Sequence, residues 1–278
     1  MAYFLNDQST VCFQFSSGTY ANASGAGQWL GLVQSCETTE NLNTQKVRYT
    51  GTASRDIGRF VNTVQDYDFS LSFIPQDWKM FTFALGSCVD SGSPSPYAHD
   101  IVAINSTSVN PFISGTKNPF ASFTLLDEQI SVGTNYNFKK TANGCMVNDL
   151  TISAAEGDFV TVEVNGIAQN VTMSESGAAT SVTESTTTPY LWQDCCCHIP
   201  SGTLVTGMTD FSFKVDNKLV AKHYGNGSVV VELPTPTERE YELSLTLDAS
   251  TESRLTMYNS YFKGGSVFNA MLHIGKNT

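Results

Sequence analysis

Strict alternation of apolar and polar residues marks two segments of this chain, Asp66 to Phe73 and Glu240 to Leu247. Successive side chains of a β-strand point to opposite faces, so this alternation predicts two strands that each have one buried and one wet face. The apolar faces consist of Tyr67, Phe69, Leu71 and Phe73 and of Tyr241, Leu243, Leu245 and Leu247. The polar faces consist of Asp66, Asp68, Ser70 and Ser72 and of Glu240, Glu242, Ser244 and Thr246. The two strands therefore share one binary pattern and nearly the same residue types.

The similarity of the two segments continues on both sides of the strands. Downstream, Pro75 to Leu85 and Ser250 to Phe262 carry apolar residues at helical spacing, and Asp77 and Ser250 are the predicted N-caps. Upstream, Asn41 to Ser54 and Val215 to Ser228 share an Asn, a basic residue before an aromatic one and a Gly-containing turn. We therefore expect an internal duplication of a unit built from strands and one helix, with each helix on the apolar side of its own sheet.

The region between the two copies contains three further predicted strands, Phe120 to Leu126, Cys145 to Ser153 and Phe159 to Asn165. Ser174 to Thr188 is rich in Ser and Thr, which predicts an exposed loop or linker. We expect a mainly β fold of two tandem β-sandwich or barrel domains, each with one flanking α-helix. The expected parts are a first domain with an N-terminal arm at 1–173, a loop or linker at 174–207 and a second half at 208–278. The alternative division has the strands of 120–173 shared between the two domains.

The net negative charge of the chain limits the partners that it can bind. The formal net charge is −11, from 26 acidic and 15 basic side chains, which argues against a protein that binds phosphate backbones by counterion release. Residues 1–15 have no basic segment ahead of a long apolar run, and no stretch elsewhere approaches the length of a membrane span. We expect no signal peptide, no membrane contact and synthesis in a cytoplasm.

Signatures of catalysis or metal binding are weak. The run Cys195 to His198 offers zinc-ligand types, but adjacent strand residues point to opposite faces and no second ligand pair has the usual spacing. Asp66 and Asp68 resemble a catalytic carboxylate pair, yet Glu240 and Glu242 repeat them in the second copy, which favours a wet acidic surface. The phosphate-binding loop, nucleophile-elbow and zinc-protease motifs are absent. We expect no enzyme activity, cofactor or metal, and we interpret Cys195, Cys196 and Cys197 as structural.

Several long segments resemble the tail tube proteins, or major tail proteins, of long-tailed bacteriophages and related archaeal viruses. They are Arg48 to Ser87, Ser95 to Ile101, Gly144 to Val171 and the C-terminal copy. The resemblance implies a structural virion protein whose β-sandwich subunits join their sheets into a closed β-barrel ring. It further implies that rings stack through a long loop and terminal arms, that viral DNA passes down the lumen without specific binding, and that other tail proteins bind the tube ends. The expected location is the virion tail, after assembly in the host cytoplasm.

The polar strand faces are predicted to line this lumen, because carboxylates and hydroxyls suit a wet channel that repels its cargo. The predicted lumen-facing residues are Asp66, Asp68, Ser70, Ser72, Glu240, Glu242, Ser244 and Thr246. Rings in the family are commonly sixfold, so a duplicated chain implies a trimer with pseudo-sixfold symmetry; a hexamer with one copy packed outside is the alternative. A different class of protein also fits the alternation, namely a β-sandwich module for carbohydrate binding or adhesion, which would stay monomeric and expose aromatic side chains.

Overall fold

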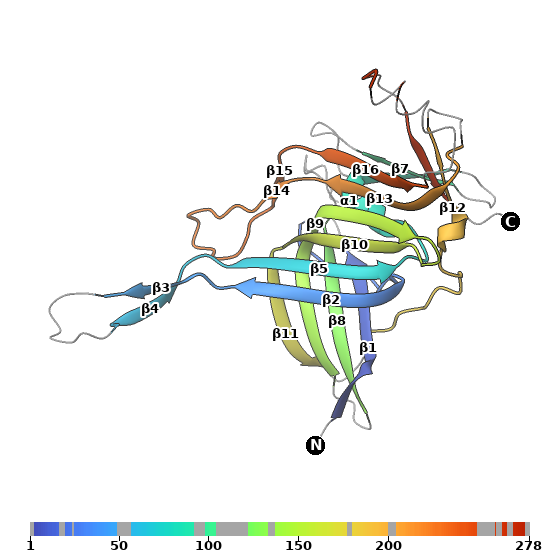
Figure 1. Ribbon diagram of the computed structural model, residues 1–278. Helices are drawn as coiled ribbons and strands as arrows, with labels where there is room; N and C mark the ends of the chain where they lie inside the picture. The colour runs from blue at the N-terminus through green and yellow to red at the C-terminus, as the bar shows by residue number, and fades with distance from the viewer. Residues whose placement is uncertain are drawn as a thin grey trace.

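Strand β9 (Asn137–Ala155) organises the fold, because it takes part in both β-layers of the protein (Figure 1). The computed structural model describes residues 3–16, 20–23, 25–48, 57–91, 98–103, 122–132, 137–176, 180–199, 204–248, 259, 263–265 and 269–275. Residues 137–145 of β9 pair in one layer, and residues 146–155 pair in the other. The two layers are therefore parts of one sheet that folds over along β9.

The broad sheet is the layer in which strands lie in the order β2-β5-β10-β9-β13-β16, with all neighbours antiparallel. Its other strands are β2 (Leu32–Asn41), β5 (Asp66–Ile74), β10 (Thr161–Ala168), β13 (Met208–Asp216) and β16 (Glu240–Leu247). The narrow sheet contains β1 (Tyr3–Phe15), β8 (Phe123–Val132), the first half of β9 and β11 (Asn170–Ser176). Two-stranded ribbons extend this framework: β3 (Thr44–Val47) with β4 (Arg59–Asn62), β6 (Gly86–Ser91) with β7 (Ala98–Ala103), β12 (Cys195–His198) with β17 (Met271–Ile274), and β14 (Leu219–Val220) with β15 (Thr235–Pro236).

Two local irregularities let β9 serve both layers. Gly144 has φ of +65°, and a Cβ there would lie 2.9 Å from the Ala21 Cβ, so this turn of the strand requires glycine. A β-bulge follows, because Asn165 pairs with Asp149 whereas the next residue of β10 pairs with Val147. The bulge changes which residues of β9 face the core.

An aromatic cluster holds the layers together. The rings of Phe69 on β5 and Phe123 on β8 meet edge to face, with centroids 5.6 Å apart. Helix α1 (Lys79–Leu85) adds Phe83, whose ring centroid lies 4.8 Å from that of Phe123. The helix ends at Gly86, which has the left-handed conformation typical of a C-terminal cap. Edge-to-face contacts of this kind stabilise a core beyond the area that they bury.

Asn217 joins three elements beneath the broad sheet. It is fully buried, and its Nδ2 donates hydrogen bonds to the carbonyl oxygens of Ala84 (2.9 Å) and Val147 (3.1 Å). Its Oδ1 accepts a hydrogen bond from Nε of Arg239 at 2.9 Å. The end of α1, the bulge of β9 and the segment before β16 are thus fixed to one side chain.

The expectations for strands and helix are largely confirmed. The two alternating segments form β5 and β16, Cys145 to Ser153 lies inside β9, and α1 lies within Pro75 to Leu85. The helix begins later than predicted: its N-cap is Trp78, although the Asp77 carboxylate accepts a hydrogen bond from the Lys79 N–H at 3.2 Å. The mainly β class is confirmed.

Other expectations have different outcomes. The second predicted helix, Ser250 to Phe262, lies outside the described residues except for Asn259, so it stays a prediction. Within 174–207, residues 174–176 belong to β11, and the described residues 180–188 form no helix or strand and are mostly exposed. Residues 192–198 form the 3₁₀ helix η1 (Trp192–Asp194) and β12, where Cys197 is buried. The apolar face of β16 is less buried than expected, since Tyr241 is 53% exposed. Both alternating strands lie in one broad sheet, and the division into two domains stays a prediction.

We expect Asn217→Ala to lower the free energy of unfolding by about 2–4 kcal/mol, because it leaves buried carbonyl groups without their donor. Asn226→Ala is the matched control, since the side chain of Asn226 is exposed and its loss should change stability by less than about 0.5 kcal/mol. Urea unfolding at a protein concentration that keeps the chain monomeric measures both. Equal effects of the two substitutions would show that Asn217 is not a structural hub.

Candidate functional site

The residues predicted to face a lumen lie on one face of the broad sheet. Directly opposed residues of antiparallel strands share a face, so the strand register carries this assignment across the sheet. One such row runs from β5 to β16 through Ser72, Glu163, Thr151, Lys214 and Glu242. The structure thus brings together the polar residues of the two alternating segments, which are far apart in sequence.

The same face contains polar residues that the sequence interpretation left out. They are Glu37 and Thr39 on β2, Thr161, Glu163 and Asn165 on β10, Asp149, Thr151 and Ser153 on β9, and Asp210, Ser212, Lys214 and Asp216 on β13. Those on β10 and β13 alternate with buried or half-buried apolar residues, a signal that was present in the sequence. Those on β9 could not be assigned to a face without knowledge of the bulge.

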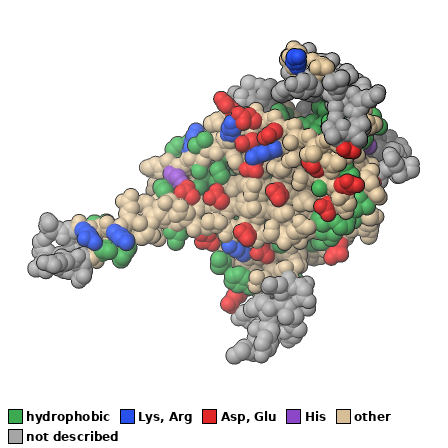
Figure 2. Space-filling view, in the orientation of Figure 1, with side chains coloured by type: hydrophobic (Ala, Val, Ile, Leu, Met, Phe, Trp, Pro, Cys, Tyr) green, Lys and Arg blue, Asp and Glu red, His purple; other side chains and the backbone are tan. Residues whose placement is uncertain are grey.

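The face is acidic and wet. Its acidic residues are Glu37, Asp66, Asp68, Asp149, Glu163, Asp210, Asp216, Glu240 and Glu242. Among the polar residues named for this face, the basic one is Lys214. Figure 2 shows acidic side chains spread over the broad sheet in this view. Asp68, Ser70, Glu240, Glu242, Ser244 and Thr246 are exposed, and Asp66 and Ser72 are half-buried. A surface of this charge repels phosphate groups.

Two of the predicted acids have partners that no local pattern could reveal. An oxygen of Asp66 lies 2.8 Å from Nε2 of His223, and its other oxygen accepts a hydrogen bond from Asn43 at 2.8 Å. Glu240 forms an ion pair with Lys218 at 2.5 Å. Among the described residues Asp68 and Glu242 have no ion-pair partner, and partial burial together with the nearby Asp66 raises the pKa of Asp68. Asp68 and Glu242 are therefore the acids whose charge can be changed without breaking an ion pair.

The arm, defined as residues 42–48 and 57–62, projects from the end of β2 away from both layers (Figure 1). Apart from the half-buried Ile57, its large apolar side chains are exposed, and Phe60 has 60% of its surface in contact with solvent. Lys46, Arg48 and Arg59 are also exposed, and no acidic residue occurs in these two ranges. The arm is therefore a basic and apolar protrusion on an acidic protein.

The two ends of the broad sheet have unpaired edges in the described part of the chain. Strand β2 pairs only with β5, and β16 pairs only with β13. Free backbone N–H and C=O groups at such edges are available to a strand from another chain.

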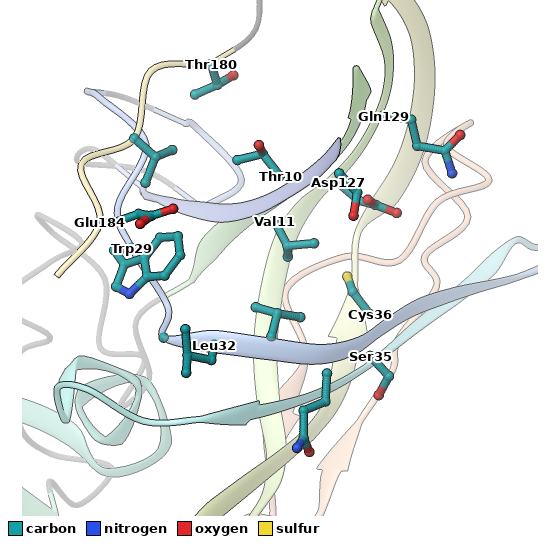
Figure 3. Close-up of a pocket in the computed structure, with 15 residues that line it drawn as sticks. Thr10, Val11, Trp29, Leu32, Ser35, Cys36, Asp127, Gln129, Thr180 and Glu184 are labelled. Carbon is teal, nitrogen blue, oxygen red and sulfur yellow. The ribbon is translucent and has the colours of Figure 1, made fainter. Parts of the chain in front are cut away.

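A pocket of about 530 Å³ opens between β2 and the edge of the narrow sheet (Figure 3). Strands β1, β2 and β8 form its walls, and residues 180–188, here called the strap, form its remaining side. The strap is anchored by the buried Glu128, which accepts hydrogen bonds from the backbone N–H (2.7 Å) and hydroxyl of Thr180 and pairs with Lys139 at 2.7 Å. Gln76 also donates to the carbonyl oxygens of Ser185 and Thr187.

The consecutive cysteines point to alternate sides of β12. Cys195 and Cys197 pack against apolar clusters, and burial raises the pKa of Cys195 to about 12. Cys196 faces the other way and lies opposite His273 on β17. Within the described ranges, no three His, Cys, Asp or Glu side chains are grouped to hold a metal ion. A protonated, packed thiol is a poor nucleophile, which agrees with a structural role for Cys195 and Cys197.

Comparison with known protein families identifies a match over most of the chain. The family model described as phage tail tube protein matches residues 16–271 of this chain. No curated protein matches it. In the part of the chain that the structure describes, no helix has the length and apolar character needed to span a membrane.

We expect Glu128→Gln to loosen the strap and to lower the free energy of unfolding by about 1–3 kcal/mol at neutral pH, because a charge-assisted buried hydrogen bond is lost. Burial raises the pKa of Glu128, but hydrogen bonds from Lys139 and Thr180 outweigh burial, so the pKa lies below its usual 4.5. The stabilisation is therefore complete above the unfolded-state pKa and lost as the pH falls through the lower folded-state pKa.

Urea unfolding from neutral to acidic pH measures this effect, and limited proteolysis reports the exposure of residues 180–188. The control is Glu175→Gln on β11, where the side chain is exposed. If the free energy of unfolding falls equally in Glu128→Gln and in the parent as the pH is lowered, the Glu128 carboxylate does not anchor the strap.

Proposed function

Since this chain belongs to the phage tail tube protein family, we propose that it is a structural virion protein whose copies polymerise into the stacked rings of a tail tube. Viral DNA passes through this tube during delivery into the host. The subunits assemble in the host cytoplasm, and other tail proteins bind the tube ends. The chain has no enzymatic role in this proposal.

The observation that carries the proposal is a polar face across the broad sheet that ends, within the described residues, in two unpaired strand edges. We infer that β2 of one copy pairs with β16 of the next, so that broad sheets join side by side. A heterologous contact that repeats from copy to copy closes a ring when the rotation between neighbouring copies divides a full turn into a whole number of steps. The polar face then lines the lumen, and the aromatic core and narrow sheet lie outside it.

A trimeric ring with pseudo-sixfold symmetry is the proposed arrangement. The antiparallel pairs β2–β5 and β13–β16 occupy the two ends of the broad sheet. In each pair the chain makes an excursion between the two strands: the arm lies between β2 and β5, and the ribbon β14–β15 lies between β13 and β16. A chain that carries two similar units supplies two of six positions, so three chains complete the ring.

The acidic lining keeps DNA mobile in the tube. Duplex DNA has a dense row of phosphates, and a protein binds it strongly only by replacing counterions with Lys or Arg. The rows across the broad sheet offer Lys214 among many carboxylates. Asp66, Asp68, Ser70, Ser72, Glu240, Glu242, Ser244 and Thr246 are thus proposed to face water and passing DNA.

Assembly is tested by sedimentation and electron microscopy over a rising protein concentration. We expect rings or tubes, and symmetry averaging of the rings separates a trimer from a hexamer. The matched variant is Leu245→Pro: proline removes a backbone donor and disrupts the pairing of β16, so it should reduce assembly. A parent protein that stays monomeric at high concentration would contradict the proposal and favour a carbohydrate-binding or adhesion module.

The lumen is tested by replacing Asp68 and Glu242 with Lys, which leaves the ion pairs of Asp66 and Glu240 intact. We expect normal tubes, because exposed carboxylates contribute little to stability. The variant tubes should bind duplex DNA in a salt-dependent manner, and virions that contain them should deliver DNA poorly.

The control for this experiment has the same change in charge elsewhere, with Glu156→Lys in the β9–β10 turn and Glu175→Lys on β11. Filter binding at several salt concentrations and infection assays compare the two variants. Equal DNA binding by both, or labelling of Asp68→Cys on the outside of intact tubes, would show that the polar face does not line the lumen.

A further inference from the structure

The root of the arm, where the chain leaves the broad sheet after β2 and returns to it before β5, is closed by side chains. Asn43 lies on the outgoing side with a left-handed φ of +39°, a conformation that Asn tolerates better than most residues. Its carbonyl oxygen accepts hydrogen bonds from the backbone N–H (3.3 Å) and the hydroxyl (2.7 Å) of Thr63 on the returning side. Its Nδ2 donates to the Asp66 carboxylate at 2.8 Å. The first residue of β5 is thus part of this closure.

The loop of the ribbon β14–β15, residues 221–234, reaches the same root from the second half of the chain (Figure 1). Nε2 of His223 lies 2.8 Å from the Asp66 carboxylate, and Gln65 donates its backbone N–H to the carbonyl oxygen of Val229 at 2.8 Å. Because an ionised carboxylate only accepts hydrogen bonds, Nε2 is the donor in this contact. Nδ1 of the same ring is buried and has no hydrogen-bond partner in the described part of the chain, so within that part the Asp66 contact alone orients the ring.

This loop is held by the core of the protein. Val231 is fully buried, and Val230 packs against the main core cluster. The backbone N–H of Glu232 donates to the carbonyl oxygen of Lys222 at 2.9 Å, which closes the loop on itself. Ahead of β14, Asn217 ties the chain to α1 and β9. A contact between such a fixed loop and the root of a protrusion limits the directions that the protrusion can take.

The corresponding position of the second alternating strand is different. Glu240 begins β16 as Asp66 begins β5, but it is exposed and pairs with Lys218, which precedes β14. An exposed ion pair of this kind contributes little to stability. The side chains of Asp66 and His223 are only 35% and 19% exposed. The half-buried contact therefore distinguishes the root of the arm from the otherwise similar second half.

We propose that residues 221–234 act as a brace that fixes the direction in which the arm leaves the broad sheet, with Asp66 and His223 as its positioning residues. The brace and the arm come from different halves of one chain, so each subunit aligns its own arm before it meets another copy. A protrusion that already has one direction loses less conformational freedom on binding than one that swings. The benefit to assembly rests on the proposed function, whereas the brace itself does not.

Hydrogen exchange of single backbone amides tests the brace in the full chain. We expect His223→Ala to speed exchange of the Thr63 and Gln65 amides about tenfold, because a charge-assisted hydrogen bond that resists local opening is lost. The amides of β10 should keep their rates, which separates this effect from a loss of global stability. His223→Gln retains an N–H donor near the position of Nε2 and should restore slow exchange. The matched control is His273→Ala, since His273 is exposed on β17.

A distance measurement reports the direction of the arm itself. Spin labels at Phe60→Cys on the arm and Glu163→Cys on the broad sheet, two exposed positions, should give one narrow distance distribution. Adding His223→Ala should broaden it, and adding His273→Ala should not. A chain with neither added cysteine corrects for labelling of the native thiols.

Equal exchange rates and equal distance distributions with and without His223→Ala would overturn the inference and leave the proposed function intact. By electron microscopy, His223→Ala should require a several-fold higher protein concentration than the parent to form tubes. A parent that forms neither rings nor tubes would overturn the proposed function, and the exchange rates and distances would still decide whether the brace exists.

Discussion

The contact between Phe69 and Phe123 decides which side of the broad sheet meets water. These rings join the two layers, and Phe83 of α1 and Phe13 of β1 pack against Phe123 at the same place. Because side chains of a strand alternate between faces, burying Phe69 commits Asp68 and Ser70 to the opposite face. The antiparallel register then transmits this choice from strand to strand. The acidic surface is thus a consequence of how the core is packed.

Strand β9 keeps polar residues on the same wet face where the sheet continues into β13 and β16. Without its bulge, Asp149 and Thr151 would exchange faces with their neighbours, and carboxylates would be directed into the core. Burying an unpaired carboxylate is costly, so the bulge allows one strand to bridge two layers while its polar residues stay on the wet side. Asn217 then ties the bulge to α1 and to the segment that leads into β16.

The sequence revealed those elements whose signal is local. Strands β5 and β16 were predictable because each has a strictly alternating pattern, and α1 because its apolar residues have helical spacing before Gly86. The extent of β9 was not predictable, since residues of both faces are buried where it changes layers. The anchor of the strap was not predictable because Glu128 is 52 residues from Thr180, and the partner of Asp66 was missed because His223 is 157 residues away. Such contacts depend on the tertiary fold, and a window of neighbouring residues contains no trace of them.

The makeup of the polar face has a consequence for the genome that the proposed tube would carry. Base sequence is read by donors and acceptors that enter a groove, most often on Arg, Asn or Gln, whereas a carboxylate held at a distance senses only the phosphate backbone. The rows across the broad sheet consist of Ser, Thr, Asp and Glu together with Asn165 and Lys214, and all of them are fixed in an antiparallel ladder and cannot reach into a groove. A channel with such walls treats every duplex alike. It would impose no constraint on nucleotide composition, and a virus could change its genes freely without any matching change in this protein.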